Sequence, residues 1–589
     1  MRGVKRIRPL ICHPGRWHHS ITSRSNGLGL LALALACSGG LVLARCELSR
    51  DQGSLDRALA AVTALTRTAV AVSDSIGVPS TLSVKIIEAA EGVFRDVAAL
   101  SRDAAYERLQ KALLLIDFAR IHTELGSSEL ARTRTSEADS LLQGLAAAHP
   151  NDPGWQRDVS IAYSKLGDLL KTQNRLEHAY AHYDASRAIL EGHAAGLSAE
   201  NKRRLAISFI DMGDVDIARG FLNEALSNYD QSLVIMDRLA TAEPGNPDWQ
   251  HRLVLSHRKI GDVLQLEGKL DEALVSYTTS QALAQGLVAA DPDNIAGQRG
   301  LTAAYFQIGE VFALQDRLDE GLANYRASNT IAQRFAATNP ASADWQHQLG
   351  ISHDRIASIL EARNDFGRAL EHYRAALEIA SRLAALIPKD AILQRNLGLA
   401  HGHVGDVLLP LSDLAGALKA YEASRAIIYR LTEVDPRNTA WQYDLGISHA
   451  RIGLMLESQG DFASAVEEYE ACLAIAKRLA AANRDNALVQ RNLALVYGKL
   501  AAAHHHLGKS GQAITELQQG RKIIAALIEV APGIERLTGD LELFEHRISA
   551  LEGRGQRDGD SPSGTAFSMT LSTAMTSAAE ADQVQEPAD

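Results

Sequence analysis

Cysteine is scarce in this sequence of 589 residues, which has only Cys12, Cys37, Cys46 and Cys472. Three of the four lie within the first 46 residues, and no two have the CxxC spacing of a zinc site. The sequence therefore predicts neither a disulfide framework nor a structural zinc site.

Basic charge is also in short supply. The chain has 60 Lys and Arg against 71 Asp and Glu, a formal net charge of −11. A protein that follows a nucleic acid backbone needs clustered Lys and Arg. The composition therefore argues against a nucleic acid partner.

Motifs of catalysis and nucleotide binding are missing as well. The sequence contains no GxxxxGK[ST], GxSxG or HExxH, and no GxGxxG at the end of an expected strand. His504, His505 and His506 are consecutive, so on a helix they point about 100° apart and do not converge on one metal ion. We expect a protein that is not an enzyme and binds no cofactor or metal; an accessory subunit of an enzyme is the remaining alternative.

Long apolar runs are limited to one, from Leu28 to Ala44. It has 17 uncharged residues, about the minimum for a helix across a roughly 30 Å hydrocarbon core. The basic arm, residues 1–27, precedes it, which by the positive-inside rule predicts a single-pass membrane anchor with the following chain on the periplasmic side. A cleaved signal peptide, lipidation at Cys37 and a misassigned start codon remain alternatives.

What the sequence does contain is a repeat. A tyrosine recurs every 46 or 48 residues, and a small residue lies four positions before each one: the tyrosines are Tyr183, Tyr229, Tyr277, Tyr325, Tyr373, Tyr421 and Tyr469. A fixed period of this length indicates stacked supersecondary units without one central core.

Each unit is expected to be a helical hairpin. In residues 246–292, Asn246-Pro247 is a helix start, Gly268 stands where the first helix must turn, and Asp291-Pro292 ends the second. Small residues in the first helix (Gly167, Gly261) and the second (Ala179, Ala273) are expected to let the helices approach while Tyr183 or Tyr277 fills the adjacent gap.

Tryptophan marks every second unit. Trp155, Trp249, Trp345 and Trp441 are 94 or 96 residues apart, which indicates duplication of a two-repeat block. We expect each tryptophan to pack on the preceding repeat. His257, His353, His401 and His449 occupy a column otherwise aromatic, and we interpret them as aromatic replacements in a helix seam.

These columns resemble the tetratricopeptide repeat (TPR) family, whose Leu-Gly, Ala, aromatic and small positions correspond to Leu166-Gly167, Ala179, Tyr183 and Ser186. The units are longer than the 34 residues of that family. The resemblance implies an all-α, right-handed superhelical solenoid of about nine antiparallel hairpins over residues 103–532. It also implies a scaffold or adaptor that binds another protein or peptide on its concave face. An anchor followed by long repeats is similar to bacterial membrane-anchored signalling proteins.

Flanking segments complete the predicted organisation. Residues 54–100 read as a juxtamembrane helical stalk with two apolar stripes, through which the chain could self-associate as a homo-oligomeric structural or sensory component. Residues 534–552 predict a capping helix, and residues 553–589 a disordered tail.

An acidic column follows the small residue of the first helix. By the resemblance it lines the concave surface, where a carboxylate ladder would attract a basic peptide; its members are Asp168, Asp214, Asp262, Glu310 and Asp406. The alternative is a solvated face on which these acids pair with nearby Lys165, Lys259, Arg355 or Arg451.

Overall fold

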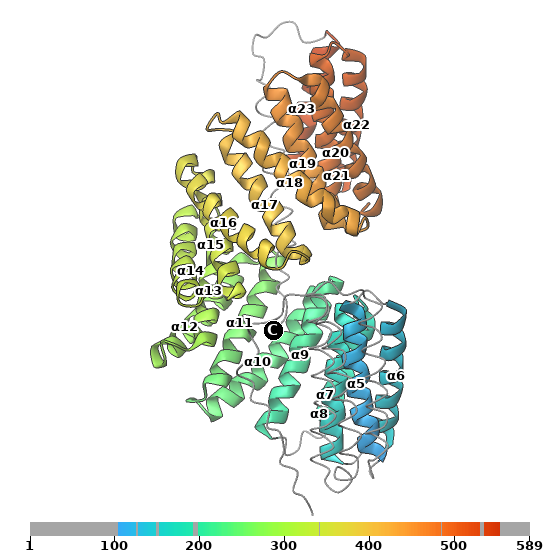
Figure 1. Ribbon diagram of the computed structural model, residues 1–589, viewed down its shortest axis with the longest axis vertical. Coiled ribbons are helices and arrows are strands. Elements are labelled where there is room, and N and C mark those ends of the chain that lie inside the picture. The colour runs from blue at the N-terminus through green and yellow to red at the C-terminus, as the bar shows by residue number, and fades with distance from the viewer. Residues whose placement is uncertain are drawn as a thin grey trace, which may run out of the picture. The chain divides into compact units, whose positions relative to one another are not determined.

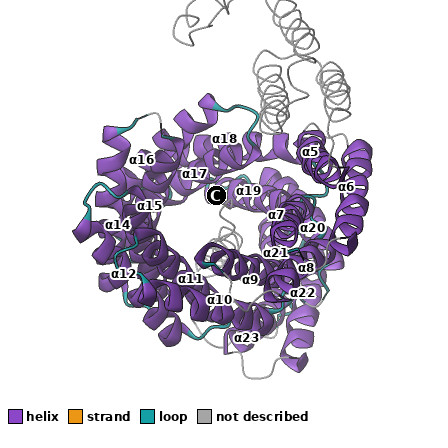
Figure 2. Cartoon of the chain, turned by 90° about the horizontal axis from the view of Figure 1, so that it is seen from below, coloured by secondary structure: helices purple, strands orange, loops and turns teal. Residues whose placement is uncertain are grey.

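The computed structural model describes residues 104–124, 128–148, 152–192, 198–340, 342–484, 486–530 and 535–553. Every regular element in these ranges is a helix (Figure 2), which confirms the predicted all-α class. Within the same ranges, no helix is long and apolar enough to cross a membrane. The predicted basic arm, anchor, stalk and tail lie outside the described residues.

Nineteen helices are described, and consecutive helices pair as hairpins (Figure 1). The chain divides into two compact units, and the boundary, between Ser276 and Tyr277, falls inside α12. The helices up to this boundary are α5 (Ala104–Glu124), α6 (Ser128–Ala148), α7 (Pro153–Thr172), α8 (Leu176–Gly192), α9 (Ala199–Arg219), α10 (Leu222–Ala242), α11 (Pro247–Leu266) and α12 (Leu270–Ala290).

The second unit continues the same order of hairpins. Its helices after α12 are α13 (Ile295–Leu314), α14 (Leu318–Thr338), α15 (Ala343–Ala362), α16 (Phe366–Leu386), α17 (Ala391–Leu408), α18 (Leu414–Val434), α19 (Thr439–Ser458), α20 (Phe462–Ala482), α21 (Ala487–His506), α22 (Ser510–Val530) and α23 (Glu535–Leu551). Pairing α5 with α6 and so on to α21 with α22 gives nine hairpins, followed by α23.

The sequence starts each first helix in the same way. From α7 to α21, the residue before every odd-numbered helix is Asp, Asn or Ser, and its side chain accepts a hydrogen bond from a backbone N–H of the first turn. Asn246, for example, caps α11 through Asp248 N at 3.0 Å, and Pro247 follows it at the first helical position.

The turn between the helices of a hairpin uses one left-handed residue. Gly268 has φ +77°, and the same column has positive φ in every hairpin from α7/α8 to α21/α22: Asn174, Gly220, Asp316, Asn364, Ser412, Gly460 and Gly508. Glycine, asparagine and aspartate tolerate this conformation best, so the prediction from their recurrence is confirmed.

Tyrosine and glycine make the seam of a hairpin. Tyr183 is fully buried, and a Cβ added to Gly167 would lie 2.6 Å from its ring, closer than real contacts allow. The same holds for Gly213 against Tyr229 and for Gly453 against Tyr469. The ring therefore packs directly against the glycine, as the small columns predict.

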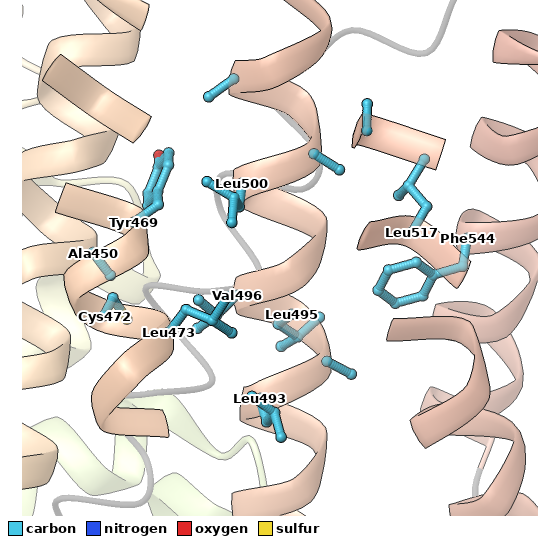
Figure 3. Packing of buried hydrophobic residues seen from close by; sticks show 14 of the residues in the cluster. Ala450, Tyr469, Cys472, Leu473, Leu493, Leu495, Val496, Leu500, Leu517 and Phe544 are labelled. Carbon is cyan, nitrogen blue, oxygen red and sulfur yellow. The ribbon is translucent and has the colours of Figure 1, made fainter. Parts of the chain in front are cut away.

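Helix α23 takes the place of another first helix at the end of the second unit. Arg491 of α21 forms a salt bridge to Asp540 of α23, 49 residues on, just as Arg395 of α17 does to Asp444 of α19. Phe544 of α23 packs on Gly520 and is fully buried. Figure 3 shows Leu517 and Phe544 on one side of α21 and Tyr469 and Cys472 on the other, so α23 covers the apolar face of the last hairpin.

Candidate interaction surface

The first helices of the hairpins form one side of each unit, which we call the inner face. Helix α7 contacts α5 and α9, and α17 contacts α19, so first helices meet across successive hairpins. The acidic column lies on this face. So does a second column three residues earlier, which we call the cation column: Lys165, Asp211, Lys259, Gln307, Arg355, His403, Arg451 and Lys499.

The acidic column serves the tyrosine seam. The tyrosine hydroxyl donates to the carboxylate 15 residues earlier: Tyr183 to Asp168 at 2.7 Å, Tyr229 to Asp214 at 2.5 Å, and Tyr421 to Asp406 at 2.9 Å. Burial and these neighbouring carboxylates raise the pKa of all three phenols. A phenol with no acceptor would be costly in such a place, so one function of these acids is structural.

Two repeats that have the seam tyrosine lack an acid in this column, and a glutamate elsewhere on the first helix replaces it. Where Ser358 and Leu454 stand, the hydroxyls of Tyr373 and Tyr469 instead donate to Glu361 at 2.9 Å and Glu457 at 2.8 Å. Sequence reasoning missed these glutamates. The available signal is an acid 12 residues before the tyrosine in the repeats whose usual acid is absent.

Three acids of the column also bind a cation from the next hairpin. Lys259 Nζ lies 3.0 Å from Asp214, Arg355 Nε lies 3.3 Å from Glu310, and Arg451 pairs with Asp406. The partners are 45 residues apart, and the three cations lie on the tryptophan-bearing helices α11, α15 and α19. The alternative interpretation named three of these cations, but their pairs join successive hairpins and do not lie on the surface of one helix.

Asp168 and Asp211 are arranged differently. Among the residues that the structure describes, neither forms an ion pair. Asp211 occupies the cation column, and burial, then the nearby Asp168 carboxylate, raises its pKa well above the usual value. This part of the inner face, on α7 and α9, thus has carboxyl groups that no internal ion pair neutralises. Asp262, the remaining predicted site residue, is partly buried on α11.

The tryptophans lie at the edges between hairpins. Trp345 stacks on Phe335 of the preceding α14, with ring centroids 4.7 Å apart, and Trp441 packs against a cluster that includes Ile428 and Leu431 of α18. In both cases the predicted contact with the preceding repeat is confirmed. Trp249 is buried and donates through Nε1 to Glu243 at 3.0 Å.

The histidine column faces the second helix of its own hairpin. His353 Nδ1 lies 2.8 Å from His372 Nδ1, and His449 Nδ1 lies 2.6 Å from Glu468, in each case 19 residues later. Tyr163 stacks on His182 in the equivalent place. These histidines therefore occupy the hairpin seam, as their column predicts. No group of three or more metal-binding side chains occurs among the described residues.

Comparison with known proteins identifies the repeat type. Residues 448–478, in α19 and α20, match the family described as tetratricopeptide repeat. Gly453 and Tyr469 of the matched segment recur as columns in the other hairpins, so those hairpins share its seam. No curated protein matches the chain.

Three solved structures are similar to parts of this chain. A tetratricopeptide repeat protein from Parabacteroides merdae is 14% identical, with 58% of this chain and 98% of that chain covered and a TM-score of 0.31. RapI in its apo form is 12% identical, covering 68% and 100%, with a TM-score of 0.43. A Rap protein complexed with competence and sporulation factor is 14% identical, covering 72% and 99%, with a TM-score of 0.38.

Proposed function

We propose that this chain is an adaptor that binds another protein or peptide on the inner face of its TPR-type array, without catalysis of its own. Stacked helical repeats present extended surfaces to macromolecules, and these repeats use their recurring small residues for packing. The single observation that carries the proposal is the seam itself, because Tyr, Gly and Ala columns recur as in a TPR.

The partner segment that fits best is basic. Asp168 and Asp211 are two carboxyl groups of the inner face that form no ion pair within the described residues, whereas Asp214, Glu310 and Asp406 each have a cation. The cation column has an aspartate, Asp211, in place of a cation. A lysine or arginine side chain of a partner would supply the missing positive charge.

The test is binding of an extended Lys- and Arg-rich peptide library to the full-length protein. The double variant Asp168→Asn/Asp211→Asn removes both carboxyl groups, while the amide oxygen introduced at position 168 still accepts the hydrogen bond of Tyr183. We expect its affinity to fall about tenfold or more, the size of loss typical of a charge pair at an interface.

The control is Asp184→Asn on the second helix α8, which removes one charge from a residue already paired with Arg187. It should leave binding unchanged. Because the raised pKa of Asp211 must fall when a cation binds, affinity should also rise with pH. If the library fails to bind, or the double variant binds like the wild-type protein, the proposal is refuted.

We also propose that residues 28–44 tether the array to a membrane, with the array on the periplasmic side. The support is the basic arm before an uncharged run. A reporter enzyme that works only outside the cytoplasm, fused after Asp589, should be active. Activity of a cytoplasm-dependent reporter at the same position would contradict this orientation.

A further inference from the structure

Three successive first helices of the second unit share one charged cluster on the inner face. Helix α15 contributes Asp354 and Glu361, α17 contributes His403 and Asp406, and α19 contributes Arg451. The second helices α16 and α18 add Tyr373 and Tyr421. Arg355 of α15 is turned to Glu310 of α13.

The contacts of this cluster cross from hairpin to hairpin. His403 Nδ1 lies 2.7 Å from Asp354, which joins α17 to α15, and Arg451 donates to Asp406, which joins α19 to α17. His403 also meets the ring of Tyr373, with centroids 5.4 Å apart. The same side chains that fill the inner face therefore hold three hairpins together.

Little room is left for other arrangements. A Cβ on Gly402 would collide with the guanidinium of Arg451, so glycine at this position makes space for the arginine. Tyr373 and Tyr421 are buried, and Arg451 is 7% exposed. Asp354 and His403 are less enclosed, with 22% and 21% of their side chains exposed, so the tight packing is around Arg451 and the two tyrosines.

We propose that this cluster is a proton-controlled latch, in which protonated Glu361 and protonated His403 hold α15, α17 and α19 together and loss of these protons loosens the second unit. With its proton, Glu361 presents no negative charge to Asp406, and charged His403 pairs with Asp354. Without the protons, Glu361 and Asp406 repel one another and the His403–Asp354 bond loses its charge assistance.

Two titrations give the latch its direction. Burial, then the Asp406 carboxylate, raises the pKa of Glu361 to about 7. Burial would lower the pKa of His403, but Asp354 outweighs it and raises that pKa above 6.5. The pKa of Asp354 is lowered, because His403 outweighs the burial that would raise it.

The sign of the effect follows from linkage. A group whose pKa is raised in the closed state stabilises that state below its ordinary pKa and loses this contribution as pH rises through the raised value. For Glu361 the loss runs from pH 4.5 to about 7, and for His403 it runs upward from 6.5. Both groups therefore favour opening between pH 5 and pH 8.

The experiment is amide hydrogen exchange of the full-length protein from pH 5 to pH 8, corrected for the intrinsic pH dependence of exchange. Since one pKa unit corresponds to a tenfold change in equilibrium constant, protection of α15–α17 peptides should fall up to roughly 100-fold. Glu361→Gln keeps the size and acceptor of the side chain without its charge, and should abolish most of this fall. Peptides of α9 and α10 in the first unit are the internal reference.

Matched variants separate the latch from general destabilisation. Glu457→Gln changes the equivalent partner of Tyr469 and should leave the pH dependence of α15–α17 intact. His403→Gln should remove only the part of the fall above pH 6.5, which tests the latch even if Glu361→Gln folds poorly. A pH-independent protection of α15–α17, or a fall that persists unchanged in both Glu361→Gln and His403→Gln, would overturn the proposal.

Discussion

The two units have the same repeat scaffold but differ in how the charges of the inner face are paired. In the first unit the cation column reads Lys165, Asp211, Lys259, and the acid at its centre forms no ion pair within the described residues. In the second unit the column ends with four basic residues in succession, of which the first three bind carboxylates of the same inner face: Arg355, His403, Arg451 and Lys499. The difference teaches that a repeat can either neutralise its inner face internally or leave charge for a partner.

Solvent access separates the units further. The side chains of Lys259 and Asp214 are 28% and 19% exposed, whereas those of Arg451 and Asp406 are 8% and 9% exposed. The same contact, at the same repeat position, is thus partly wet in one unit and buried in the other. The energetic consequences should differ, because water screens an ion pair and a buried charge without its partner is costly.

The largest expected effect tests this difference directly. Arg451→Ala leaves Asp406 buried without its cation and should destabilise the second unit by about 3–5 kcal/mol. Lys259→Ala removes a partly exposed partner and should cost about 1 kcal/mol or less in the first unit. Urea denaturation, with hydrogen exchange to assign each loss to a unit, gives both values.

A double variant checks the cause. Arg451→Met with Asp406→Asn removes both charges while the amide oxygen introduced at position 406 still accepts from Tyr421, so it should lose less stability than Arg451→Ala alone. If Arg451→Ala and Lys259→Ala lost equal stability, burial of the ion pair would not distinguish the two units.

The seam should respond alike in both units. Ala225 in the first unit and Ala369 in the second are fully buried between helices, and Leu at either position should overpack the seam at a cost of about 1–3 kcal/mol. Thermal unfolding measures both. A cost confined to one unit would show that the tyrosine seam is not the shared element of the fold.

Sequence predicted the seam better than the charges, for a physical reason. Gly167, Ala179 and Tyr183 pack together within one hairpin, so their requirements recur at every repeat and appear as columns. The αL column and the helix starts are equally local. The acidic column was visible too, but its hydrogen bonds to tyrosine and its ion pairs across repeats were not.

Those charge contacts depend on which side chains of different hairpins come together, at sequence separations of 45 or 49 residues. Glu361 and Glu457 lie outside the acidic column and still bind Tyr373 and Tyr469, since a glutamate one turn later reaches the same hydroxyl. Asp211 stands out only after the cation column is known. Spacing in the sequence reveals which positions recur from repeat to repeat. Which of these side chains contact one another is known only once the hairpins are stacked in the structure.

Acid should weaken the second unit at a different place from the latch. Burial, then His372, lowers the pKa of His353 to about 4, so its neutral form stabilises the hairpin above pH 6.5 and this contribution is lost as pH falls through about 4. After allowance for solvent screening we expect about 1 kcal/mol.

His353→Phe should remove this acid sensitivity from α15 and α16, as read from unfolding at pH 4 and pH 7. In the first unit, burial also lowers the pKa of His257, but Asp237 opposes the shift, so His257→Phe should have the smaller effect. If the two substitutions change acid stability equally, the His353–His372 contact adds nothing to burial.

The smallest effect concerns the turns. Ser412 has φ +62°, a conformation that costs most residues with a Cβ about 1 kcal/mol or more, and Ser412→Gly should therefore stabilise the second unit by about 1 kcal/mol in urea denaturation. Asn174→Gly in the first unit should gain less, because asparagine tolerates the left-handed region better than serine. Gly460→Ala should lose a similar amount. Ser412→Gly could be neutral while Gly460→Ala is destabilising. In that case the greater freedom of glycine in the unfolded chain would offset the relief of strain at Ser412. The comparison of turns would then measure chain entropy instead of backbone conformation.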